Sequence, residues 1–174
     1  MITIISGTNR VGSNTRKVAE TYARILEQKQ VPYQFLSLEG VNVLQRDEAF
    51  VAIENEYIIP TTDFLIVSPE YNGSFPGVLK LLMDTGKTDK LWWNKRAMLA
   101  GVATGRAGNL RGMDHLTGVL NHMKMTVLPT KLPISQVDKL LDAEGKYIAE
   151  PGTLQAMERQ VDEYLVWIGA EQVA

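Results

Sequence analysis

Five short apolar runs alternate with five amphipathic stretches along the chain, and this alternation constrains the fold more than any other feature. The runs have the length and the branched residues of strands, and the stretches between them repeat apolar residues at the helical period. We expect strands at Ile2–Ser6, Gln34–Leu38, Asp63–Ser68, Arg96–Ala103 and Met125–Leu128. The expected helices are Asn14–Gln30, Asp47–Ile59, Pro76–Thr85, Asn109–Lys124 and Leu154–Ile168.

Strands that alternate with helices in this way predict an α/β fold, in which a doubly wound parallel sheet lies between two layers of helices. The length of 174 residues suits one domain, so we expect residues 1–174 to form a single unit. Ligands of such sheets bind beyond the carboxyl ends of the strands. Three loops that follow expected strands are therefore candidates for a site: Ser6–Thr15, Ser68–Gly77 and Thr104–Asn109.

Composition excludes several classes of function. The net charge is −2, from 18 basic and 20 acidic residues, and leaves no basic surplus for a nucleic-acid backbone. The chain has no cysteine, which excludes disulfides, thiolate nucleophiles and cysteine-based metal sites. No segment approaches 18 consecutive apolar residues, and the start of the chain lacks the pattern of a signal peptide. We therefore expect a cytoplasmic protein that does not enter a membrane.

The first loop, SGTNRVGSNT, has glycines at the spacing of a nucleotide-binding phosphate loop, but Ser13 stands where that pattern needs lysine. Hydroxyl and amide donors crowd the loop, and a helix is expected to begin beside them with its free N–H groups. This equipment predicts binding of a phosphate monoester and argues against ATP hydrolysis, which needs the lysine and magnesium ligands. The alternative is an ordinary strand-to-helix loop with a helix cap.

The second loop, SPEYNGSFPG, holds two prolines and two glycines, which predict a rigid backbone with outward-pointing N–H groups. Glu70, Tyr71 and Asn72 form its apex, and such a loop favours a planar heteroaromatic ligand. A structural turn with Tyr71 packed on the next helix is the alternative. The third loop, ATGRAGNLRG, is again rich in glycine, and Arg106 is available to an anionic partner. A flexible connection explains this third pattern equally well.

The stretch from Ser68 to Lys80, SPEYNGSFPGVLK, with Asp84 after it, closely resembles the hallmark of the NADPH-dependent FMN reductase family. That family includes flavodoxin-like quinone, chromate and azo-dye reductases, and Ser6–Thr15 resembles its FMN phosphate loop. The resemblance implies a three-layer flavodoxin-like fold with a five-stranded parallel sheet in the order 2-1-3-4-5. It also implies that the protein is a homodimer or a homotetramer.

The resemblance further implies which residues bind FMN. The phosphate would be held by Thr8, Arg10, Ser13, Asn14 and Thr15. The isoalloxazine ring would be lined by Pro69, Glu70, Tyr71, Asn72 and Gly73, and covered through Thr104, Gly105 and Gly108. Two departures stand out. Arg106 and Ala107 interrupt the consecutive glycines common in the third loop, and Leu81-Leu82-Met83 replaces an Asn-Ala-Ile type sequence near the expected subunit contact.

The chemistry implied by the resemblance is flavin-centred. NADPH or NADH passes hydride to bound FMN, and a small acceptor such as a quinone then takes the electrons. No side chain is required as acid, base or nucleophile, so we predict no catalytic residue in the chain. Two alternatives remain open from the sequence: an FMN-binding electron-transfer protein of flavodoxin type without NAD(P)H activity, and an interaction protein that kept only the fold.

Other conspicuous residues favour structural explanations. His115 and His122 lie seven apart on one expected helix, and without a third ligand they do not predict a metal site. Trp92 and Trp93 indicate packing or a subunit contact rather than a substrate wall. A loose basic cluster favours a solvated loop over a site for the phosphate of a nicotinamide dinucleotide. Its members are Lys87, Lys90, Lys95 and Arg96.

Overall fold

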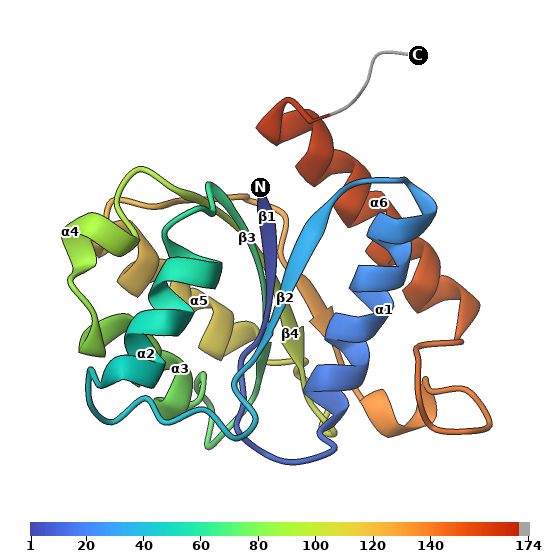
Figure 1. Cartoon of the computed structure of the whole chain (residues 1–174). Helices are drawn as coiled ribbons and strands as arrows, with labels where there is room; N and C mark the ends of the chain where they lie inside the picture. Colours follow the sequence, from blue (N-terminus) through green and yellow to red (C-terminus); the bar gives the residue numbers. More distant parts are fainter. Residues whose placement is uncertain (171–174) are drawn as a thin grey trace.

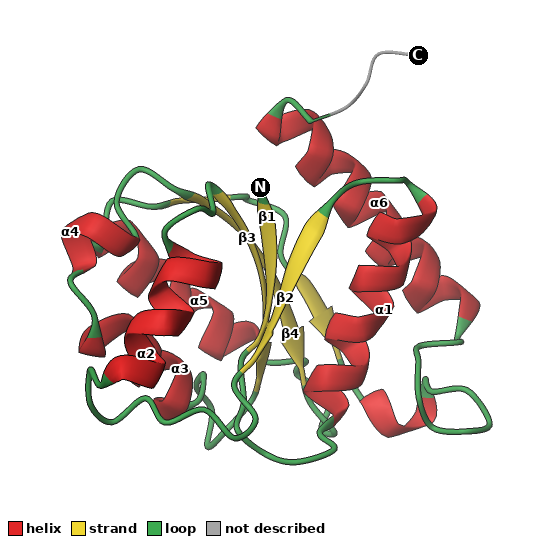
Figure 2. Cartoon of the chain, viewed as in Figure 1, coloured by secondary structure: helices red, strands yellow, loops and turns green. Residues whose placement is uncertain are grey.

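A computed structural model describes residues 1–170 and shows a parallel sheet between two layers of helices (Figure 1). Helices α1 and α6 cover one face of the sheet, and α2 to α5 lie on the other (Figure 2). The strands are β1 Ile2–Ser6, β2 Tyr33–Ser37, β3 Asp63–Pro69, β4 Arg96–Val102, β5 Thr126–Val127 and β6 Leu132–Ile134. Their order β2-β1-β3-β4-β5 confirms the predicted topology.

The fifth position of the sheet differs from the single strand that the sequence predicts. Two short strands share it: β5 pairs with Arg96 and Ala97 at the start of β4, and β6 pairs with the segment Ala100–Val102 at its end. Between them lies Pro129, which has no N–H group to donate to a neighbouring strand. The expected strand Met125–Leu128 therefore shortens to Thr126–Val127, and the sheet contains six strands instead of five.

The helices are α1 Asn14–Gln28, α2 Glu48–Ile53, α3 Gly77–Thr85, α4 Thr88–Leu91, α5 Leu110–His122 and α6 Pro151–Ile168. Helix α4 is absent from the sequence prediction because four residues are too few to show a helical period. Helix α6 begins three residues earlier than predicted. The carboxylate of Glu150 accepts hydrogen bonds from the N–H groups of Gly152 and Thr153, and Pro151 occupies the first helical position.

The long predicted helix Asp47–Ile59 is regular only in its first half. A π-helical turn, Glu54–Ile58, continues α2. Its first residue, Glu54, is buried and forms an ion pair with Arg46, whose Nη2 atom lies 2.7 Å from the carboxylate. A buried carboxylate needs a charged partner, and Arg46 provides it. The ion pair is thus located where the helix changes from α-helical to π-helical geometry.

The hydrophobic core has two parts, one on each face of the sheet. Along β1, Ile4 packs with the α1 and α6 layer, whereas Ile5 packs with the layer that contains α3 and α5. The alternation along a strand that is buried on both faces explains why the runs are apolar throughout. Trp92 is fully buried against Phe64, with ring centroids 5.2 Å apart, which confirms the prediction of packing. Within residues 1–170, no helix combines the length and the apolar character needed to cross a bilayer.

Candidate functional site

The three loops singled out in the sequence meet at the carboxyl edge of the sheet, the lower edge in Figure 1. Between them lies a cavity of about 240 Å³. Residues from β1–α1, β3–α3 and β4–α5 connections line it together with one residue from beyond β6. The lining consists of Arg10, Val11, Ser13, Asn14, Thr15, Pro69, Glu70, Tyr71, Val102, Ala103, Thr104 and Val137.

The first loop brings the start of α1 to the cavity. The N–H group of Gly7 donates to the carbonyl oxygen of Val67 in β3 at 2.8 Å. A Cβ atom at position 7 would lie only 2.9 Å from that oxygen, so this close approach of the first loop to β3 requires glycine. The hydroxyl of Ser13 caps α1 by accepting from the N–H group of Arg16 at 3.2 Å. The N–H groups of Asn14 and Thr15 find no acceptor in the part of the chain that the structure describes. They are therefore free to bind an anion at the positive end of the helix dipole.

Two residues expected at the phosphate have other partners. Thr8 is buried and does not line the cavity; its hydroxyl shares a 2.5 Å hydrogen bond with the hydroxyl of Tyr71. The side-chain amide of Asn14 donates to Asp138 at 2.5 Å and its oxygen accepts from Lys17. Of the five residues expected at the phosphate, four line the cavity: Arg10, Ser13, Asn14 and Thr15. Thr8 instead contacts the second loop through its hydrogen bond to Tyr71.

The second loop forms a tight turn at its apex. Tyr71 and Ser74 exchange main-chain hydrogen bonds of 2.9 and 3.2 Å. Asn72 and Gly73 between them have φ angles of 53° and 77°, in the left-handed region. The guanidinium of Arg10 lies 4.0 Å from the centroid of the Tyr71 ring, which is a cation–π contact. Pro69, Glu70 and Tyr71 line the cavity, while Asn72 and Gly73 lie outside its lining.

The third loop contributes Thr104, but its glycines do not line the cavity. The carbonyl oxygen of Gly105 accepts from the N–H group of Gln136 at 2.9 Å. Gly108 has a φ angle of 55°, and a Cβ atom there would lie 2.7 Å from the Cβ of Pro133. The Gly105 hydrogen bond and the missing Cβ atom of Gly108 thus keep the third loop close to the segment from Pro133 to Gln136.

Sequence reasoning missed several residues at this edge. Val11, Val102, Ala103 and Val137 line the cavity, and Val137 comes from a 3₁₀ turn, Val137–Lys139, more than 120 positions after the first loop. No local pattern identifies such a residue. Asn109, expected only as the start of a helix, is a fully buried residue that contacts the second loop. The Gly108-Asn109 pair was a usable signal, because both residue types favour left-handed backbone.

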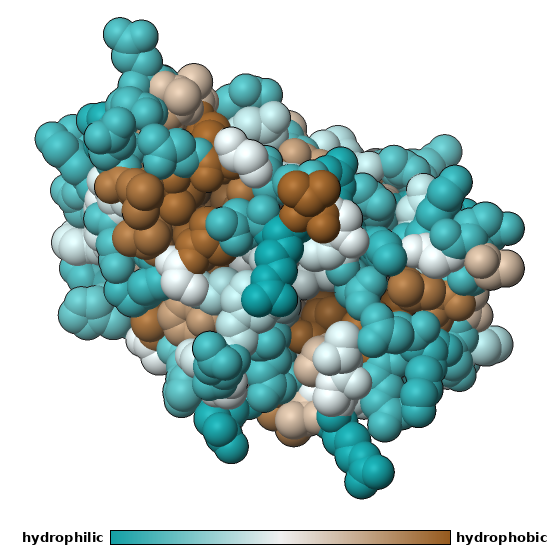
Figure 3. Space-filling view, turned by 90° about the horizontal axis from the view of Figure 1, so that it is seen from below, coloured by the Kyte–Doolittle hydropathy of each residue, from teal (hydrophilic) through white to brown (hydrophobic). Residues whose placement is uncertain are grey.

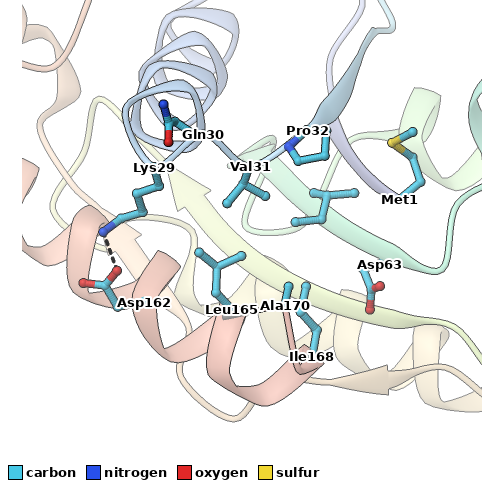
Figure 4. A pocket seen from close by; sticks show the side chains of 11 residues that line it. Met1, Lys29, Gln30, Val31, Pro32, Asp63, Asp162, Leu165, Ile168 and Ala170 are labelled. Carbon is cyan, nitrogen blue, oxygen red and sulfur yellow. Dashed lines mark ion pairs between the residues drawn. The ribbon is translucent and has the colours of Figure 1, made fainter. Parts of the chain in front are cut away.

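A larger cavity, of about 630 Å³, lies at the opposite edge of the sheet (Figure 4). Val31, Leu165 and Ile168 supply apolar walls, and Lys29 and Asp162 form an ion pair of 2.5 Å at its side. This cavity adjoins the amino ends of the strands and the carboxyl end of α1, where helix carbonyl groups repel anions. A phosphate-bearing ligand therefore fits the smaller cavity and not this one.

The other conspicuous residues have structural partners. Lys95 donates to the carbonyl oxygens of Ile58 and Ile59, and burial lowers the pKa of its ammonium group to about 8. Arg96 is bound to Asp63 at 2.6 Å, also at the amino edge and far from the candidate site. Ser74 and His115 share a hydrogen bond of 3.0 Å. No group of three potential metal ligands occurs among residues 1–170.

The fold defines a flavodoxin-like protein, and the cavity at the carboxyl edge of its sheet has the donors that a phosphate-bearing cofactor needs. The phosphate of FMN needs hydrogen-bond donors and a positive field, and the first loop offers both. The donors are the free N–H groups of Asn14 and Thr15 and the Thr15 hydroxyl, and the guanidinium of Arg10 adds positive charge. Residues 1–139 match the family described as NADPH-dependent FMN reductase. The chain belongs to this family, and it is an NAD(P)H-dependent oxidoreductase with FMN as cofactor.

Individual relatives agree with this assignment. A 2-hydroxy-1,4-benzoquinone reductase from Burkholderia sp is 25% identical over 182 residues, which cover 99% of this chain and 98% of the relative. The flavoenzyme NAD(P)H:(acceptor) oxidoreductase FerB from Paracoccus denitrificans has a structure with a TM-score of 0.81, at 20% identity over 97% of this chain and 96% of that one. A flavodoxin from the domain Archaea aligns with a TM-score of 0.58, at 17% identity over 94% and 96%. The two structures show the shared fold, and the family match favours the enzyme over the electron-carrier alternative.

Proposed function

We propose that the protein transfers hydride from NAD(P)H to bound FMN and then passes the electrons to a small quinone-type acceptor. The observation that carries this proposal is the meeting of the α1 amino terminus and the Ser68–Gly77 loop in one cavity. When bound, FMN would supply the redox chemistry: a hydride from NAD(P)H and one proton from solvent would reduce it, and transfer of two electrons and two protons to a quinone would give a hydroquinone and restore oxidised FMN.

The residues of the chain bind and orient the cofactor in this proposal. Arg10, Ser13, Asn14 and Thr15 hold the phosphate, mainly through main-chain N–H groups and the Arg10 charge. Thr8 holds the Tyr71 ring in place. Pro69, Glu70 and Tyr71 line the cavity and face the isoalloxazine ring, and the main chain of Asn72 and Gly73 extends this edge beyond the cavity. On the third loop Thr104 covers the ring, and Gly105 and Gly108 set the course of the loop that carries it.

Two main-chain donors of the second loop are available to the ring. The N–H groups of Glu70 and Tyr71 are bound to Val102 and Ser74, whereas those of Asn72 and Gly73 have no acceptor among residues 1–170. We assign the free pair to the ring, where donors stabilise the partly anionic reduced state. No side-chain acid or base is needed for hydride transfer.

The small size of the cavity is the basis for expecting two substrates to use one site. Its volume of about 240 Å³ is below the range of about 300–1,000 Å³ for pockets that enclose a small-molecule ligand. FMN is therefore only partly enclosed, and its exposed part is open first to NAD(P)H and then to the acceptor.

An anaerobic titration tests the function. The purified protein should retain FMN or bind added FMN, NADPH or NADH should bleach the flavin absorbance, and a benzoquinone should restore it. A flavin that stays oxidised with both nicotinamide cofactors contradicts the proposal, whereas bleaching without reoxidation by quinone contradicts only the acceptor class.

We also propose a cytoplasmic homodimer or homotetramer built from one FMN-binding domain per chain. Hydrophobic side chains gather on the α2 and α3 side of the site edge (Figure 3). A groove of about 420 Å³ lies there between the loop Val41–Leu44 and α3, with Val78 and Leu81 on its wall and Leu44 77% exposed. Burial of these residues against a second copy removes apolar surface from water. Light scattering should give a mass of two or four 19.4 kDa chains, and a monomer contradicts this assembly.

A further inference from the structure

Asn109 is the last residue before α5, and its surroundings are unusual for an asparagine beside a loop. It is 0% exposed, and its φ and ψ angles of 63° and 29° place it in the left-handed region. Few residues other than glycine adopt this conformation, and asparagine is among the most tolerant. The side chain of Asn109 is thus held at one buried position at the carboxyl edge of the sheet.

The side-chain amide of Asn109 ties the third loop to the second. Its Nδ2 atom donates to the carbonyl oxygens of Ser68 and Pro69, at 2.9 and 3.0 Å, and lies 3.3 Å from the Ser68 hydroxyl. The main-chain N–H group of Asn109 donates to the carboxylate of Glu70 at 3.2 Å. Because the acceptors are main-chain carbonyls, the atom that faces them must be the amide nitrogen.

Two glycines leave the space that this amide occupies. A Cβ atom at Gly112 would lie 2.0 Å from Oδ1 of Asn109, and one at Gly101 would lie 3.0 Å from the Asn109 Cβ. Oδ1 itself is buried without a hydrogen-bond partner among the described residues. An unpaired buried oxygen is unfavourable, and here it accompanies the hydrogen bonds that the amide nitrogen makes to Ser68 and Pro69.

We infer that Asn109 is a positioning residue, which sets the separation between the second and third loops and so the width of the slot for the flavin ring. This inference rests on the proposed function, because the slot matters only if FMN occupies it. Thr104 to Ala107 are exposed, and the loop is fixed at two places: the carbonyl oxygen of Gly105 binds the N–H group of Gln136, and the buried Asn109 binds β3. Of these two anchors, only Asn109 joins the third loop to the second. A slot formed before binding avoids the cost of ordering the loop around the ligand.

The first test is Asn109→Gly, which keeps the left-handed backbone and removes the amide. We expect FMN affinity, measured by quenching of flavin fluorescence, to fall by about tenfold or more. At saturating FMN, the visible circular dichroism of the flavin should also weaken, because the ring is less firmly oriented. The matched control is Asn94→Gly. Asn94 is another left-handed asparagine, with a φ angle of 61°, but it is exposed at the opposite edge of the sheet.

Asn109→Asp provides a nearly isosteric second variant that preserves packing if the glycine variant fails to fold. Its carboxylate repels the two carbonyl oxygens, whereas its protonated form donates one hydrogen bond. The ratio of its FMN dissociation constant to that of the wild type should therefore fall as the pH is lowered from about 8 to about 5.5. Wild-type affinity and dichroism in the glycine variant, or a flat ratio in the aspartate variant, would overturn the inference. Failure of the wild type to bind FMN counts against the proposed function instead.

Discussion

Replacing Ser13 with aspartate is expected to weaken FMN binding by about 100-fold or more, which corresponds to about 2.7 kcal/mol. The Ser13 hydroxyl caps α1 and lines the cavity at the same time. Aspartate is an equally good cap and favours the positive end of the helix, so the unliganded protein should unfold at the wild-type temperature or slightly above it. Its charge, however, faces the phosphate dianion, and like charges a few ångströms apart repel by several kcal/mol near a protein surface.

The experiment pairs a titration of FMN fluorescence with thermal unfolding of the unliganded variant. Asp47→Ser is the matched control, because Asp47 caps α2 by accepting from the N–H group of Phe50 at 2.9 Å and lies outside the cavity. This reverse exchange of cap residues should leave FMN affinity unchanged. Repeating the titration at higher salt should narrow the gap between Ser13→Asp and the wild type. Wild-type affinity in Ser13→Asp would show that the phosphate binds elsewhere.

Gly101→Ala should have the largest effect on stability. Gly101 lies in β4 beneath the third loop, and an added Cβ atom would be 2.2 Å from the carbonyl oxygen of Gly108 and 2.9 Å from the methyl group of Met113. The backbone of the loop must move away, and such overpacking costs about 3 kcal/mol. For a chain of this size, the unfolding temperature should then fall by about 6–12 °C.

The displaced loop should also impair the cofactor site, since Thr104 lines the cavity and Asn109 joins the loop to β3. Gly118→Ala on α5 serves as the control, because Gly118 is exposed outside the site and a Cβ atom there meets nothing within 4 Å. That variant should keep the wild-type FMN affinity and unfold at the wild-type temperature or slightly above it, since alanine favours a helix over glycine. A stable Gly101→Ala protein that binds FMN normally would contradict the close packing of this loop on β4.

Local patterns predicted most of the sheet correctly. The strand Ile2–Ser6 and the start of α1 at Asn14 coincide with prediction, because an apolar run buried on both faces and a serine cap are signals carried by neighbouring residues. The segment Leu132–Ile134 was missed because three residues with a central proline show no strand period. Its strand character comes from β4, which offers hydrogen-bonding partners along Ala100–Val102.

For the candidate site too, some features were predictable from neighbouring residues and others depend on the folded structure. Local patterns along the chain were enough to predict the alternation of the main strands and helices and to identify the donor-rich loops, because turn residues and helix starts act over a few positions. Which donors reach the cavity depends on how the folded chain packs. This packing turned Thr8 toward Tyr71, brought Val137 to the first loop and placed the Asn109 amide against β3. The physical reason is that parallel strands gather loops from distant parts of the chain at one edge, where each side chain's partners depend on that assembly.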